Sequence, residues 1–117
     1  MTELLAQGDL LIERVPDIAP SGTIEENTEN TEGSVIVLAE GEESGHRHAI
    51  GERATMFRDE RLARDIPAGL YIGHVRVNSA YARVTHDEHA PITLPRGTYR
   101  VRRQRELGPR DARVLAD

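Results

Sequence analysis

The chain has 117 residues, which suits one domain and leaves no room for a second core. It contains neither cysteine nor lysine, so disulfides, thiolate metal ligands, Schiff-base chemistry and a phosphate-loop lysine are excluded. The formal net charge is −5, with the acids concentrated in residues 1–52 and the arginines in residues 95–117, and this acidic balance argues against nucleic acid as a partner.

The chain contains no apolar stretch of the roughly 20 residues needed to cross a bilayer. Its first residues lack a basic region followed by an apolar one, the pattern typical of a secretion signal. We therefore expect a soluble cytoplasmic protein with no membrane partner. We expect a single β domain over residues 1–117, with residues 108–117 forming a tail.

Short apolar runs, interrupted by turn residues every eight to twelve positions, predict an all-β fold. The expected strands are 9–15, 34–40, 45–50, 54–58, 70–77, 80–86, 90–94 and 98–106. About eight short strands favour a small barrel or a double-sheet sandwich.

The connections differ in composition. Residues 16–33 form a polar acidic run that cannot bury enough surface to order itself, so we expect a mobile acidic loop, with a cation-collecting flap as the alternative. Residues 58–65 could form a short helical turn ended by Pro67. The Pro-x-Gly sequences at 67–69 and 95–97 are typical of hairpin or corner turns.

Four of the five histidines occur in two pairs. His46 and His48 are two residues apart on an expected strand, so both should face inward together with Ile50. Inward imidazoles are costly unless they are hydrogen-bonded or bind a metal, and two on one strand present two nitrogens to one ion. We interpret this pair as half of a metal site.

The second pair, His86 and His89, lies at the end of a later strand. His86 shares a face with Val84, and a turn at residues 87–88 would bring His89 beside it. Three histidines around an ion with one open position lower the pKa of bound water. We therefore expect His46, His48, His86 and His89 to be ligands of a divalent metal, zinc in first place.

The alternative is that the two pairs never meet and that each histidine caps a turn or bonds a nearby carboxylate. His74 alternates with Leu70 and Ile72, so we interpret it as a partly buried, hydrogen-bonded histidine rather than a ligand. Its replacement should mainly reduce stability.

Two functions follow from these residues. The first is a small metal-dependent enzyme, a lyase or a hydrolase, whose ion activates water for hydration or hydrolysis of a small-molecule substrate. His89 and Glu88 are its candidate catalytic residues, because His89 could accept a proton and Glu88 could orient an imidazole. We also expect a homo-oligomer, since a small sheet leaves strand edges exposed.

The second function is a non-enzymatic β-module for assembly, or for binding an acidic partner or nucleic acid through the arginine-rich strand 98–106. We favour a simpler interpretation of this strand. It would lie at an exposed edge, where its charge blocks aggregation, or it would pair with the acidic N-terminal half.

The sequence Gly45-His46-Arg47-His48, followed by Glu52, resembles the first metal motif of the cupin superfamily. Pro67-Ala68-Gly69, followed by His74 and Asn78, is similar to the second cupin motif with two extra residues before the histidine. The resemblance implies that His46, His48, Glu52 and His74 would be the ligands.

A longer pattern includes Gln7-Gly8-Asp9, the 45–48 motif and the segments 86–95 and 97–105. This pattern resembles a group of small uncharacterised bacterial and phage proteins, a likeness that supplies no function.

Overall fold

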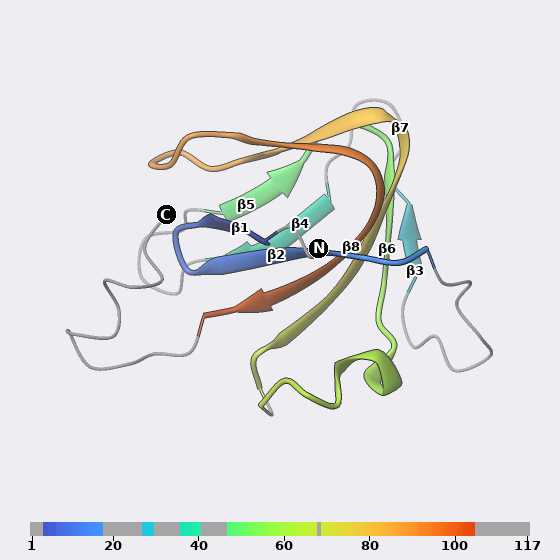
Figure 1. The fold of residues 1–117 in the computed structure, drawn as a ribbon. Coiled ribbons are helices and arrows are strands. Elements are labelled where there is room, and N and C mark those ends of the chain that lie inside the picture. Colours follow the sequence, from blue (N-terminus) through green and yellow to red (C-terminus); the bar gives the residue numbers. More distant parts are fainter. Residues whose placement is uncertain (1–3, 18–26, 30–35, 41–46, 68, 105–117) are drawn as a thin grey trace.

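Eight antiparallel strands build the protein, as the all-β prediction requires (Figure 1). The computed structural model describes residues 4–17, 27–29, 36–40, 47–67 and 69–104. The strands are β1 (Leu4–Gln7), β2 (Leu10–Val15), β3 (Asn27–Glu29), β4 (Ile36–Glu40), β5 (Arg47–Ile50), β6 (Ala54–Phe57), β7 (Tyr71–Thr85) and β8 (Ile92–Arg103). The helical structure in these ranges is one 3-10 turn, η1 (Glu60–Ala63), and no helix there could cross a membrane.

The strands form one sheet in the order β1-β2-β8-β7-β5-β4. β6 pairs with the first half of β7 and carries β3 on its other side, whereas β5 pairs with the last residues of β7. A small barrel is one of the two predicted architectures, but the described strands do not close into one. Instead β7 and β8 bend strongly, so that the sheet folds over itself (Figure 1).

The core lies inside this fold. It is made almost entirely of Val, Ile, Leu and Ala, as a chain with 3% aromatic residues requires. The second half of β7 shows the expected alternation, because Ala82 and Val84 are fully buried while Arg83 and Thr85 are exposed. The same alternation directs the next residue of that face, His86, toward the end of the core.

The prediction of separate strands at 70–77 and 80–86, and at 90–94 and 98–106, is wrong. β7 and β8 are continuous and pair along almost their whole length, with an irregular step between Val77 and Tyr81. Opposite this step lies the Pro-x-Gly sequence at 95–97, which bends β8 without reversing it. The chain reverses at residues 86–91 instead, between the two strands.

The region before β7 agrees with the sequence. The predicted helical turn is η1, which begins after Asp59, whose side chain accepts a hydrogen bond from the backbone N–H of Arg61. The predicted turn at 67–69 is also present, since the N–H of Leu70 donates to the carbonyl of Pro67 and Gly69 has a φ of +86°.

The expectation of a mobile loop over residues 16–33 is wrong at residues 27–29. β3 lies inside this segment and pairs with β6, an arrangement that a polar sequence does not predict. The remainder of the predicted loop, residues 18–26 and 30–33, and the tail 108–117 lie outside the described residues.

Candidate functional site

Three segments that are distant in sequence meet at one end of the sheet: the turn between β1 and β2, strand β5, and the hairpin between β7 and β8 (Figure 1). The ring centroids of His48 and His86 are 4.4 Å apart, and those of His86 and His89 are 4.7 Å apart. We call His48, His86, His89 and the adjacent Asp9 the histidine cluster.

His48 is held in one orientation by a buried glutamine. Nε2 of Gln7 donates to the carbonyl oxygens of Val84 and Ala90, at 2.9 and 2.8 Å, so this atom must be the amide nitrogen. The amide oxygen of Gln7 therefore accepts from Nδ1 of His48 at 2.8 Å. Because Nδ1 carries the proton, the neutral ring of His48 presents a lone pair at Nε2.

Asp9 faces that lone pair. Its Oδ1 lies 3.4 Å from Nε2 of His48, and its Oδ2 accepts from the guanidinium of Arg103 at 2.7 Å. Gln104 ties down the same turn, since its backbone N–H donates to the carbonyl of Asp9 and its side chain donates to the carbonyl of Gly8. The end of β8 thus positions the carboxylate beside the imidazole.

Gly8 makes room for the cluster. It has a φ of +59°, a left-handed conformation that glycine adopts at little cost. A Cβ atom at this position would lie 2.8 Å from Nε2 of His89 and 3.4 Å from Cε1 of His48. All three residues of the turn therefore contact the histidines. Gln7 supplies a buried amide and Asp9 a carboxylate, and the missing Cβ atom of Gly8 lets His89 approach the backbone closely.

In the β7–β8 hairpin, the backbone N–H of Glu88 donates to Nδ1 of His86 at 3.0 Å. Nδ1 is therefore an acceptor, and the neutral ring of His86 carries its proton on Nε2. The chain turns at residues 87–88, as expected, and His89 lies beside His86. The side chain of Glu88, a candidate catalytic group, is exposed.

Burial lowers the pKa of His48 below its usual value, because a charged ring would lose its hydration. The neighbouring His86 lowers it further, whereas the carboxylate of Asp9 opposes the shift. His48 is therefore neutral at neutral pH, the form in which an imidazole binds a metal.

The structure thus brings together three of the four predicted ligands, His48, His86 and His89, and the fourth, His46, lies outside the described residues. As oriented, no three His, Asp or Glu side chains in the described ranges already converge like the ligands of a bound ion. Nε2 of His86 would also have to lose its proton before it could bind an ion, because a protonated nitrogen offers no lone pair.

Two residues of the cupin-like ligand set have other contacts. His74 lies in the first half of β7, where Tyr71 bonds it and Phe57 stacks on it at a centroid distance of 5.2 Å. The carboxylate of Glu52 accepts from the backbone and the side chain of Arg83. His74 is therefore a hydrogen-bonded histidine, as predicted, but it is more deeply buried than expected.

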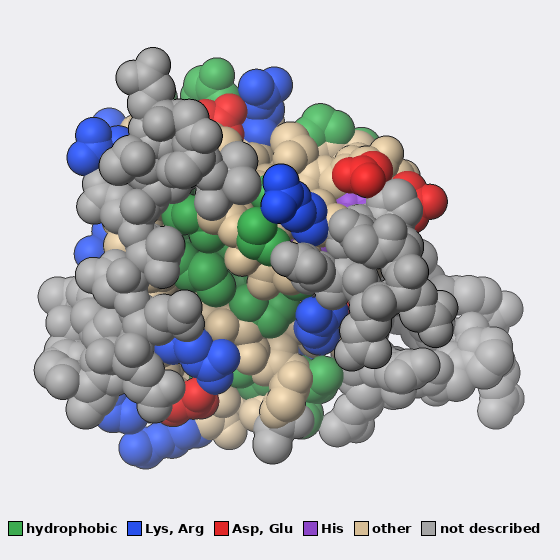
Figure 2. All heavy atoms as spheres, turned by 180° about the vertical axis from the view of Figure 1, so that it is seen from behind, with side chains coloured by type: hydrophobic (Ala, Val, Ile, Leu, Met, Phe, Trp, Pro, Cys, Tyr) green, Lys and Arg blue, Asp and Glu red, His purple; other side chains and the backbone are tan. Residues whose placement is uncertain are grey.

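The arginine-rich strand is not at an edge, contrary to our expectation, because β8 lies between β2 and β7. The error arises from the long-range pairing of β2 with β8, which covers the side of β8 that the prediction left exposed. Arg100 pairs with Glu13 and Arg103 with Asp9, so these arginines bind acids of the N-terminal part as the alternative proposed; Arg100 also pairs with Asp65. On the face shown in Figure 2, arginine side chains are scattered rather than gathered in one patch.

Sequence reasoning missed Gln7, Gly8 and Asp9 as site residues. The signal was weak, because the partners of Gln7 lie 77 and 83 residues away along the chain. The tight turn itself was the available clue, since a glycine between two polar residues marks a close approach of the backbone to something else.

A family model described as "Domain of unknown function (DUF8820)" matches residues 6–104. This range begins just before the Gln7-Gly8-Asp9 turn and includes every residue of the histidine cluster. No curated protein and no solved structure matches the chain.

Proposed function

The chain belongs to that family, whose name assigns no activity. From the geometry of the histidine cluster, we propose that the cluster binds one divalent transition metal, with zinc as the first candidate. The bound ion activates water for hydration or hydrolysis of a small-molecule substrate. His48 and Asp9 are the first two ligands. His86 is the third, and His89 either completes the set or accepts a proton.

One observation carries this proposal. Nε2 of His48 and Oδ1 of Asp9 are both electron-pair donors in their neutral-pH forms, and they face each other at 3.4 Å. Two ligand atoms at about 2 Å from a tetrahedral ion are separated by about 3.3 Å, so this gap has the size that a shared ion requires. Two lone pairs held at this distance repel each other unless a cation or a proton lies between them.

The spacing of the rings supports the same assignment. Imidazoles on one tetrahedral zinc ion have centroids about 5 Å apart, and the two measured separations, 4.4 and 4.7 Å, are within an ångström of that value. Small rotations of His86 and His89 would bring their nitrogens to the same ion. Gly8 leaves space for them, because it has no Cβ atom in contact with His89.

Metal binding makes a specific demand on His86. If its Nε2 binds the ion, its proton must move to Nδ1, which then no longer accepts from the N–H of Glu88. Binding therefore releases this backbone N–H. The ion supplies Lewis acidity and lowers the pKa of a bound water molecule, the chemistry shared by carbonic-anhydrase-like lyases and simple metallohydrolases.

The first experiment titrates zinc and cobalt into the metal-free full-length protein, with calorimetry for stoichiometry and the visible spectrum of cobalt for geometry. We expect one ion per chain and a tetrahedral cobalt spectrum. Metal addition should also shift the amide resonance of Glu88 and speed its hydrogen exchange. His48→Gln and His86→Gln should each weaken zinc binding by at least about 100-fold, because each removes a ligand.

Asp9 has a matched control. Asp9 and Asp65 are both exposed carboxylates bonded to an arginine of β8 at 2.7 Å, but only Asp9 touches a histidine. Asp9→Asn should weaken zinc binding by about 10- to 100-fold, whereas Asp65→Asn should leave it unchanged. Absence of stoichiometric binding, or equal affinities of wild type and His48→Gln, would contradict the proposed site.

Activity is tested separately. The zinc-loaded protein should accelerate carbon dioxide hydration or the hydrolysis of 4-nitrophenyl acetate, and His48→Gln should abolish the acceleration. A protein that binds zinc in the cluster but accelerates neither reaction would limit the function to metal binding.

A further inference from the structure

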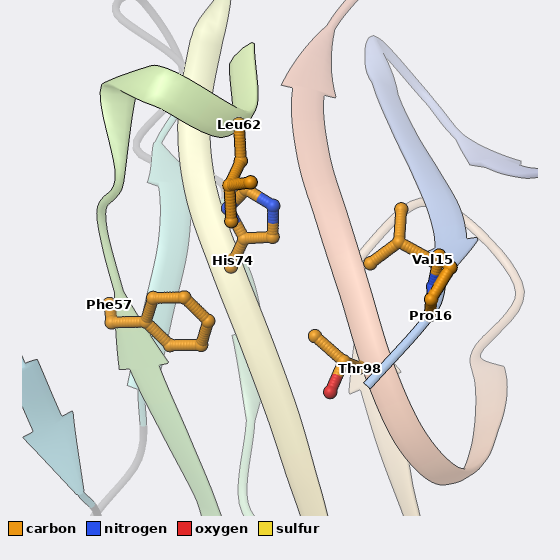
Figure 3. Close-up of a pocket in the computed structure, with 6 residues that line it drawn as sticks. All are labelled: Val15, Pro16, Phe57, Leu62, His74 and Thr98. Carbon is orange, nitrogen blue, oxygen red and sulfur yellow. The ribbon is translucent and has the colours of Figure 1, made fainter. Parts of the chain in front are cut away.

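A second histidine site lies in the other half of β7. Six residues from five segments line a cavity of about 160 Å³: Val15, Pro16, Phe57, Leu62, His74 and Thr98 (Figure 3). Its walls are apolar except at two residues. The hydroxyl of Thr98 donates to Asp17 at 2.7 Å and points away from the cavity, toward which the methyl group is directed. His74 is therefore the polar group that faces the space.

The hydrogen bonds of His74 determine what it offers. The backbone N–H of Asp59 donates to the phenol oxygen of Tyr71 at 3.0 Å, and this oxygen lies 2.6 Å from Nδ1 of His74. In the described structure, Nδ1 is the acceptor available to the phenol proton. Nδ1 therefore accepts, and the neutral ring carries its proton on Nε2.

This Nε2–H group has no acceptor among the described residues, although the exposed fraction of His74 is only 2%. In the same residues, every fully enclosed side-chain nitrogen or oxygen atom has a hydrogen-bond partner, so Nε2 keeps contact with the cavity. Figure 3 shows one ring nitrogen directed toward the space between His74 and the Val15, Pro16 and Thr98 group. A buried donor without an acceptor is costly, so a molecule in the cavity is expected to satisfy it.

The size of the cavity limits that molecule. A cavity of about 150 Å³ lined by aliphatic and aromatic side chains accommodates benzene. The pocket is partly open, so water can enter it, but the walls offer such water one polar partner, and an apolar molecule with one acceptor atom matches them better. The occupant should therefore be mostly apolar, with one acceptor atom placed against Nε2.

The charges around the cavity exclude an anion. Burial lowers the pKa of His74 to about 4, so the ring is neutral and supplies a donor without a positive charge. Of the cations near the cavity, Arg100 already binds two carboxylates, Glu13 and Asp65, and Arg76 lies over the ring of Phe57 at 5.5 Å from its centroid. A carboxylate in the cavity would lose its hydration without gaining a counter-ion.

We propose that this cavity binds a small neutral molecule with an apolar body of about six carbon atoms and one carbonyl oxygen, which accepts a hydrogen bond from Nε2–H of His74. The inference is independent of the metal site, because His74 and the histidine cluster share no described contact.

The test compares three probes of the same ring size on the full-length protein: cyclohexanone, cyclohexane and cyclohexanecarboxylate. NMR titrations monitor the backbone amides and the histidine ring nitrogens. Cyclohexanone should bind about tenfold more tightly than either other probe, as expected when a buried donor gains its acceptor. It should shift the ring N–H of His74 and the amides of Phe57 and Thr98, and leave the rings of His48 and His86 unchanged.

Two variants define the interaction. His74→Phe keeps an aromatic ring but removes the donor, so cyclohexanone and cyclohexane should bind with nearly equal affinity. Val15→Trp fills the cavity and should abolish binding of both. If His74→Phe does not fold, the affinity ratio in the wild type together with Val15→Trp decides the question.

Three results would overturn the proposal. Equal affinities of the wild type for cyclohexanone and cyclohexane would show that His74 donates nothing to the ligand. Tightest binding of the carboxylate would show an anion site. No binding of any probe up to its solubility limit would show that the cavity is closed in solution.

Discussion

His48 and His74 are both buried, both neutral at neutral pH and both bonded through Nδ1, yet they offer opposite groups at Nε2. Nδ1 of His48 donates to a glutamine oxygen, so its Nε2 presents a lone pair. Nδ1 of His74 accepts from a tyrosine hydroxyl, so its Nε2 presents a proton. The partner at one ring nitrogen thus decides whether the other can bind a cation or a hydrogen-bond acceptor.

The surroundings match this difference. Nε2 of His48 faces a carboxylate and two further imidazoles, which together suit a metal ion. Nε2 of His74 faces an apolar cavity, which suits a neutral ligand. The two functions proposed for this protein therefore follow from two tautomers of one residue type, so a substitution that changes either tautomer should change the corresponding function.

The largest expected effect is on Gln7, whose side chain is fully buried and makes three hydrogen bonds. Gln7→Leu removes the acceptor of the Nδ1–H of His48 and a donor to two backbone carbonyls, so we expect a loss of about 4 kcal/mol in the free energy of unfolding and no zinc binding. Urea denaturation measures the first and calorimetry the second. Gln104→Leu is the control, because it removes one partly buried bond in the same turn and should cost about 1 kcal/mol.

The second effect is the pH dependence of stability caused by His74. Its pKa is about 4 in the folded protein and 6.5 when unfolded, so between these values the unfolded chain binds the extra proton. Stability therefore falls as the pH decreases through this window, by about 3 kcal/mol in total. Denaturation of the metal-free protein at a series of pH values should show this slope, and His74→Gln should remove that share of it. Equal slopes for the two proteins would mean that folding does not lower the pKa of His74.

A smaller effect is expected at Gly8. Gly8→Ala places a Cβ atom 2.8 Å from Nε2 of His89 in a residue with a φ of +59°, so we expect a loss of about 2 kcal/mol and at least tenfold weaker zinc binding. Gly69→Ala is a matched control, because Gly69 also has a positive φ of +86° but a Cβ atom there would meet nothing within 4 Å. It should cost about 1 kcal/mol and leave zinc binding unchanged. Equal effects of the two substitutions would show that His89 does not depend on the open space at Gly8.

Much of the fold could be predicted because the signals are local. The inward direction of Val84 and His86 follows from the two-residue period of a strand, and the turn at 67–69 follows from its proline and glycine. The second Pro-x-Gly sequence has the same local chemistry but lies inside β8, opposite the irregular step of β7. Only the long-range pairing of these two strands distinguishes a bend from a reversal, so the sequence alone misplaced the hairpin.

The same limit applies to the two sites. His86 and His89 are three residues apart in sequence, so their contact is local. The contacts of Gln7 and Asp9 with His48, by contrast, span 41 and 39 positions of the chain. The tautomer of His74 depends on Tyr71 three residues earlier, but the direction of the tyrosine proton depends on the backbone of Asp59. Residue identity suggested which histidines face inward, while the group that each one offers depends on tertiary contacts.

The tautomers of His48 and His74 can be measured in the unsubstituted protein, with one variant as a control. Long-range nitrogen-15 NMR spectra of the metal-free protein at neutral pH should show His48 protonated at Nδ1 and His74 protonated at Nε2, because a glutamine oxygen can only accept and the tyrosine hydroxyl has its proton free to donate. Tyr71→Phe removes the donor to Nδ1 of His74 and should leave that ring in a mixture of tautomers, with His48 unaffected. Zinc should shift Nε2 of His48 and move the proton of His86 from Nε2 to Nδ1, without changing His74. If His74 carried its proton on Nδ1 instead, its Nε2 would be an acceptor, and the cavity would favour a ligand with a hydroxyl or amide donor over a ketone.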